Sequence, residues 1–308
     1  MVLKYKMQMI CDFALKGMID IKFLNAFLLF CLTMILILTF TACNGVDVSR
    51  GNNKRIIAVS IVPQAAFVEK VCGDELEVVT MIPSGASPET YEPTPAQLQK
   101  LESAELYFSI GVPSENNILS AVKSGTEVID LHTKLADIYS ELEIDGGRDP
   151  HIWLSPKRVI AMVREICNSV SKLYPQKADA FLLNAEEYIL ELQNLDTEIK
   201  AMFEQSGTTD FLVFHPAFGY FADEYGLTMH ALEEHGKEAS AKQLAKTVEL
   251  AKEKDIKVIF YQAEASVKQA EAFAEEINGK AVLLEPLAYN YIENLRKMAV
   301  AVSGESMQ

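Results

Sequence analysis

The chain has 308 residues, of which 49% are hydrophobic and 23% are charged, a composition typical of a globular protein. This length is enough for two domains of ordinary size. The 28 Lys and Arg residues against 43 Asp and Glu residues give a net charge of −15, which argues against a nucleic-acid-binding protein, because such a protein needs a basic face for phosphates. The charge suits a soluble protein whose copies are kept apart by self-repulsion, or a protein that handles cations.

Residues 1–42 have the composition of a secretory signal. A start with four lysines precedes the uncharged, apolar segment 23–40, and small residues follow just before Cys43. This ending resembles a bacterial lipoprotein signal, so we expect cleavage after residue 42 and a lipid on Cys43. An uncleaved anchor is the alternative, since the apolar segment could just span a bilayer. With either a lipid or an uncleaved anchor, we expect residues 44–308 outside the cytoplasm, tethered to the cell membrane. Translation could start at Met1 or Met18.

The remainder of the chain alternates between strand and helix patterns. Residues 43–54 are polar and form a linker. After it, a short β-rich run, a helical stretch, a turn and a second β-rich run occur four times, starting near Ile56, Leu106, Phe211 and Lys257. Strands that alternate with helices of this length predict βαβ units and mainly parallel sheets.

The middle of the chain is predicted to be helical. Ser155 and Pro156 form a good N-cap and first-turn pair, and apolar residues follow at helical spacing as far as Tyr174. A second helix should run from about residue 176 to 205. We therefore predict an α/β fold in which an N-terminal lobe (55–155) and a C-terminal lobe (176–308) are joined by a long, rigid helix (156–175).

Two cysteines remain in the predicted mature chain besides Cys43. Cys72 and Cys167 each lie within an apolar helical pattern, which predicts two buried thiols. A disulfide between them is the alternative, because the chain is expected to be exported.

Four potential metal ligands each stand beside a proline. Proline fixes its own backbone and disfavours helix in the residue before it, so these groups are expected on loops. Two come from each predicted lobe and could converge at the carboxyl ends of strands, where open α/β sheets bind their ligands. Two imidazoles and two carboxylates could hold Zn²⁺ or Mn²⁺. From the pattern alone, ordinary turn residues remain the alternative. The four are Glu89, His151, His215 and Glu285.

Five stretches resemble the metal-binding solute receptors of bacterial ABC importers for zinc and manganese. The likeness runs from about Lys54 to Val302, with the motifs in the same order. It implies two (β/α)-type lobes joined by a rigid helix, and a lipid-anchored receptor that passes a divalent cation from the cleft between the lobes to a membrane permease. The stretches are GASPETYEPTPAQLQKL (85–101), DPHIWLSP (149–156), FHPAFGYFADEYGL (214–227), HGKEASAKQL (235–244) and LLEPLAYNYIENLRKM (283–298).

The resemblance also implies a set of ligands. His151 and His215 match family ligands, and Glu285 stands where the family has Asp or Glu. Glu89 departs from the family, which has His there, so the site would hold two carboxylates. We expect zinc first and manganese second as the transported ligand, with no cofactor. Tyr91 and Glu115 could line the cleft and orient the imidazoles.

Two other functions remain open at this stage. A secreted metal-dependent hydrolase would need an open coordination position and a general base, whereas four protein ligands favour binding, so we do not expect an enzyme. A receptor of the same fold could instead bind an organic or chelated ligand, with Glu89 facing it. We expect a monomer whose partners are the permease and, through Cys43, the lipid membrane, with no nucleic acid.

Overall fold

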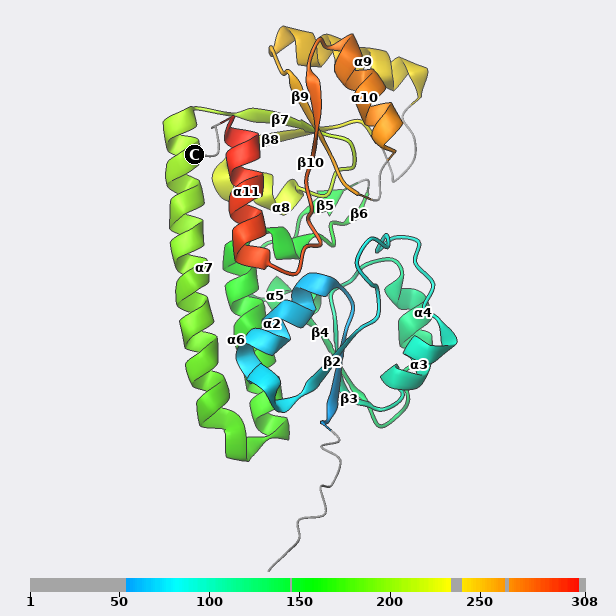
Figure 1. The fold of residues 1–308 in the computed structure, drawn as a ribbon, viewed down its shortest axis with the longest axis vertical. Helices are drawn as coiled ribbons and strands as arrows, with labels where there is room; N and C mark the ends of the chain where they lie inside the picture. Colours follow the sequence, from blue (N-terminus) through cyan, green and yellow to red (C-terminus); the bar gives the residue numbers. More distant parts are fainter. Residues whose placement is uncertain (1–53, 145, 234–239, 264–265, 305–308) are drawn as a thin grey trace, which may run out of the picture. The chain divides into compact units, whose positions relative to one another are not determined.

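The computed structural model describes residues 54–144, 146–233, 240–263 and 266–304, within the unit Lys54–Gln308 (Figure 1). The predicted signal segment and Cys43 lie outside these residues. No helix among the described residues is both long and apolar enough to cross a membrane.

The first sheet confirms the two βαβ units predicted before residue 150. It has four parallel strands in the order β2-β1-β3-β4. Residues 57–59 of β1 are fully buried, as expected for a central strand covered on both faces. The strands are β1 (Ile56–Val59), β2 (Glu77–Thr80), β3 (Ala104–Ser109) and β4 (Glu127–Asp130).

The second sheet is also wholly parallel, with strand order β10-β9-β7-β8. The repeating pattern predicts a second strand in the unit that starts near Phe211, but the sequence does not locate it, because the residues of β8, Thr-Met-His-Ala, carry no strong apolar pattern. It pairs with β7 residue by residue from Asp210↔Thr228 to Val213↔Ala231. The strands are β7 (Asp210–Val213), β8 (Thr228–Ala231), β9 (Val258–Tyr261) and β10 (Lys280–Leu283). A short antiparallel pair, β5 (Glu143–Ile144) and β6 (Gly147–Arg148), precedes the central helices.

Helices connect the strands within each sheet or follow its last strand. Near the first sheet these are α2 (Val62–Cys72), α3 (Pro95–Leu101), α4 (Glu115–Ser120) and α5 (Leu131–Ala136). Near the second they are α8 (Gly219–Tyr225), α9 (Ala241–Glu253), α10 (Val267–Glu276) and α11 (Tyr291–Ser303). Short 3₁₀ turns lie at Gly73–Glu75, Ile152–Leu154 and Pro175–Lys177.

Two long helices pack along each other and run beside the sheets (Figure 1). The predicted connecting helix is α6 (Pro156–Leu173), and the Ser155 hydroxyl caps it by accepting from the backbone N–H of Arg158. Helix α7 (Ala178–Ser206) follows after the 3₁₀ turn that begins at Pro175. Helix α7 packs on α2 from the first sheet's segment and on α11 from the second, so it supports both. The fold is therefore the predicted one, with two parallel-sheet lobes joined by a long helix.

Both remaining cysteines are buried free thiols, as the helical patterns predicted. Burial is the main cause that raises the pKa of the Cys72 thiol to about 12, and it also raises the pKa of Cys167. A thiol with a raised pKa forms little thiolate at neutral pH, so neither cysteine is suited to bind a metal.

Candidate metal centre

Glu89 lies on the loop between β2 and α3. Its backbone N–H donates to the hydroxyl of Ser87 at 3.2 Å, and Tyr91 N–H closes a turn onto Ser87 O at 3.0 Å. The preceding carbonyl, Pro88 O, accepts from the backbone N–H of Ser114 at 3.0 Å. These contacts hold a half-buried carboxylate on a loop whose proline prevents continued helix, as predicted.

His151 lies between β6 and the 3₁₀ turn Ile152–Leu154. Its Nδ1 is 2.7 Å from Asp149 Oδ1, and the same oxygen accepts from the His151 backbone N–H at 2.9 Å. Asp149 is buried, so this contact fixes the orientation of the ring through its Nδ1 side. With the proton on Nδ1, the lone pair of Nε2 is free to bind a cation.

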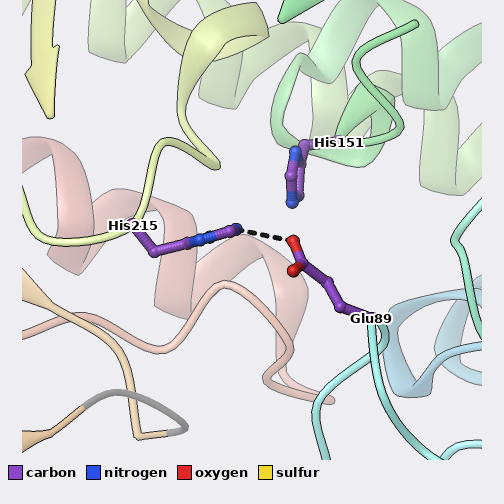
Figure 2. Close-up of side chains that lie close together, drawn as sticks. All are labelled: Glu89, His151 and His215. Atoms are coloured by element: carbon purple, nitrogen blue, oxygen red, sulfur yellow. Dashed lines mark ion pairs between the residues drawn. The ribbon is translucent and has the colours of Figure 1, made fainter. Parts of the chain in front are cut away.

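His215 follows β7 by two residues. Phe214 N–H donates to Phe260 O at 2.7 Å, which continues the pairing of β7 with β9 up to the histidine. Nδ1 of His215 is 2.8 Å from Glu233 Oε2, while Nε2 is 3.0 Å from Glu89 Oε1 (Figure 2). Glu233 is placed there because its backbone N–H donates to Phe214 O at 3.0 Å.

Three of the four predicted ligands come together. Single ligand atoms of Glu89, His151 and His215 all lie within 4.8 Å of one another, and Figure 2 shows them converging from three separate segments. They line a cavity of about 260 Å³, whose wall also includes Glu233 and Gln262. Two imidazoles and a carboxylate at this spacing are a donor set for a divalent transition metal.

The ionisable groups of the site favour a positive charge between the carboxylates, because the pKa of Glu89 is lowered and that of His215 is raised. The hydrogen bond from His215 is the largest cause that lowers the pKa of Glu89. Burial alone would lower the pKa of His215, but the hydrogen bonds to Glu233 and Glu89, with their charges, raise it to about 9. Without a cation, a proton on His215 therefore pairs with the two carboxylates.

The fourth predicted ligand, Glu285, lies outside this group. Its side chain is exposed, although the next residue, Pro286, lines the cavity. The loop is held by its backbone, because Trp153 Nε1 donates to Pro286 O at 2.9 Å and Asn294 Nδ2 donates to Glu285 O at 2.7 Å.

The two residues expected to orient the imidazoles contact other groups. The Tyr91 hydroxyl donates to Gln97 Oε1 at 2.8 Å, towards α3. Glu115 is buried and accepts from the backbone N–H groups of Ile110 at 2.7 Å and Gly111 at 2.8 Å. Burial is the main cause that raises its pKa.

Asp149 and Glu233 make the contacts to the imidazoles, and the sequence analysis missed both in this role. Asp149 stands two residues before His151, a spacing that a search for carboxylates near each histidine could have found. Glu233 could have been found only by recognising β8, since it follows the carboxyl end of that strand.

A family model for the zinc-uptake complex component A, periplasmic, matches residues 57–303. The chain belongs to this family. It is 31% identical over 256 residues to the high-affinity zinc uptake system protein ZnuA of Bacillus subtilis, covering 78% of this chain and 80% of that protein. It is 30% identical over 267 residues to the zinc-binding lipoprotein AdcA of Streptococcus pneumoniae, covering 81% of this chain and 53% of AdcA.

Solved structures agree with the observed fold. A crystal structure of ZnuA superposes with a TM-score of 0.77 at 34% identity, covering 82% of this chain and 99% of that one. The chain spans about half the length of the curated streptococcal relatives that it matches. The relatives are named for binding and uptake, and the predicted resemblance to metal-binding receptors is confirmed at the level of the family.

Proposed function

We propose that this chain is the extracytoplasmic receptor of a metal ABC importer, which captures a divalent cation between its lobes and delivers it to a membrane permease. The observation that carries the proposal is the pair of carboxylate-bound imidazoles. Nδ1 of His151 meets Asp149 and Nδ1 of His215 meets Glu233, so both Nε2 atoms are left for a cation beside Glu89. Metal-binding histidines are commonly oriented in this way.

Zinc is the first choice of cargo and manganese the second. Imidazole suits zinc, whereas carboxylates also accommodate manganese. Zinc prefers four ligands, so one position remains beyond Glu89, His151 and His215. We propose that Glu285 fills it after a rearrangement of its exposed side chain, or that water does.

A receptor for an organic or chelated cation is the second candidate. The cavity of about 260 Å³ favours it, because a bare ion with one water needs far less space. The two candidates share the same protein ligands and differ in what enters with the metal.

We further propose that a lipid on Cys43 tethers the mature chain to the cell membrane, after removal of residues 1–42. The lipoprotein name of the pneumococcal relative supports this anchor. In this proposal the receptor acts as a monomer, with residues 55–155 and 176–308 as the two lobes that enclose the cation.

Metal analysis of protein purified without chelators tests the function. We expect close to one zinc per chain, retained through dialysis and removed by acid. Substitution of both His151 and His215 by alanine should abolish it, while the exposed variant Gln193→Met should retain it. If the wild type neither retains zinc or manganese nor binds them in a titration, the proposal is wrong. Mass spectrometry of the released contents would reveal a chelate.

A further inference from the structure

Glu115 is a buried carboxylate that accepts hydrogen bonds from residues just after the carboxyl ends of two strands. It lies at the start of α4, and Ser60, just after β1, donates its hydroxyl to Oε1. Ile110 N–H, just after β3, donates to the same oxygen at 2.7 Å, and Gly111 N–H donates to Oε2 at 2.8 Å. One side chain therefore joins three groups from two neighbouring strand ends.

These contacts close the segment 110–115 into a fixed loop. The backbone N–H of Glu115 donates to Val112 O at 3.0 Å, while its carboxylate binds the amides at the beginning of the same loop. Gly111 has φ +90°, and a Cβ there would come within 3.3 Å of Arg148 Nη2, so the turn requires glycine. The loop reaches the metal centre, because Val112 and Pro113 line its cavity.

The loop is bonded to the segment that carries Glu89. Ser114, the residue before Glu115, donates its backbone N–H to Pro88 O at 3.0 Å. Pro88 directly precedes Glu89, so a movement of the 110–115 loop would move the carboxylate that meets His215 Nε2. The chain of contacts leads from Glu115 through Ser114 to Glu89.

We propose that Glu115 is a positioning residue that fixes Glu89 in the place where the cation binds. It acts through the backbone of the 110–115 loop and does not touch the cation or the imidazoles. This inference rests on the proposed function, since it assigns a role within the same site. The role differs from orienting the histidines, which belongs to Asp149 and Glu233.

A double-mutant cycle on zinc affinity tests the inference. Zinc is titrated into the full-length wild type, Glu115→Gln, Glu89→Ala and the double variant. Glutamine keeps the shape but turns one acceptor into a donor, so at least one amide loses its partner. We expect Glu115→Gln alone to weaken zinc binding about tenfold, as losses of supporting groups commonly do. In the Glu89→Ala background, Glu115→Gln should lower zinc affinity less than about twofold, because the carboxylate that Glu115 positions is already absent.

A matched control is Glu102→Gln, an exposed carboxylate near the end of α3 whose partner is Lys123 at 2.6 Å. It should leave zinc affinity unchanged in both backgrounds. Circular dichroism confirms folding, and if Glu115→Gln does not fold, Ser60→Ala removes one donor to the same carboxylate and enters the same cycle.

An equal loss in both backgrounds would overturn the inference, because Glu115 would then act on the fold in general. No loss in the wild-type background would overturn it as well. If the wild type itself does not bind zinc or manganese, the proposed function fails before any substitution is made, and this inference fails with it.

Discussion

Zinc binding should depend on pH through His215. The hydrogen bonds and charges of Glu233 and Glu89 outweigh burial and raise the pKa of this imidazole to about 9. A metal binds only the neutral ring, so zinc must displace a proton below that pH. Each pH unit between about 7 and 9 should then raise zinc affinity about tenfold. At pH 7 the proton costs roughly a hundredfold in affinity, or about 3 kcal/mol.

As the pH rises, the stability of the metal-free protein should fall while its zinc affinity increases. The pKa of His215 is raised above its unfolded value of about 6.5, so folding binds the proton more tightly. The stabilising contribution of the charged pair is fully present below about pH 6.5. It is lost as the pH rises through about 9, while zinc affinity increases over the same range. A zinc affinity that increases while stability decreases distinguishes proton displacement from unfolding, because unfolding would lower both.

Calorimetry in two buffers with different heats of ionisation measures the protons released per zinc. We expect at least one proton at about pH 7 and fewer as the pH approaches 9. Glu233→Gln should move the affinity profile to lower pH by about one unit, because the amide oxygen still accepts from Nδ1 but the charge is gone. Glu253→Gln, an exposed change on α9, is the matched control and should leave the profile in place.

A flat zinc affinity between about pH 7 and 9, with no proton released, would refute this account of His215. So would a Glu233→Gln profile identical to that of the wild type. Either result would mean that His215 is neutral in the metal-free protein and that its carboxylate neighbours only orient it.

Three further predictions follow from the sequence and the site. Glu89→Ala should weaken zinc binding about tenfold or more without unfolding the protein, whereas Glu89→His should move preference from manganese towards zinc. Calorimetry measures both affinities in the wild type and the two variants. If neither the zinc affinity nor the manganese affinity differs among the three proteins, Glu89 only lines the cavity. Cys43→Ala should abolish fatty-acid incorporation and release the protein from membranes, and absence of label in the wild type would contradict the lipoprotein assignment. Because α6 runs from Pro156 to Leu173 without glycine, lobe closure should be small, and a contraction of several ångströms in scattering radius on adding zinc would contradict this.

The order of elements could be predicted because local pattern is sufficient for it. Short apolar runs such as Ile56–Val59 became central parallel strands, and Ser155-Pro156 began the long helix as its capping chemistry indicated. The position of strand β8 could not be read from the sequence, because four residues of mixed polarity carry too little periodicity. Its pairing with β7, made across the chain, decides its conformation.

The sequence by itself determined which residues could bind a cation and that prolines would hold them on loops. The tertiary structure decided how they meet. It brought Glu89 to His215, gave Asp149 and Glu233 the contacts to the imidazoles, and left the side chain of Glu285 exposed. The physical reason is that local dihedral preferences reach only a few residues along the chain. A distance such as the 3.0 Å between Glu89 and His215 depends on strand register and helix packing, which join segments more than a hundred residues apart.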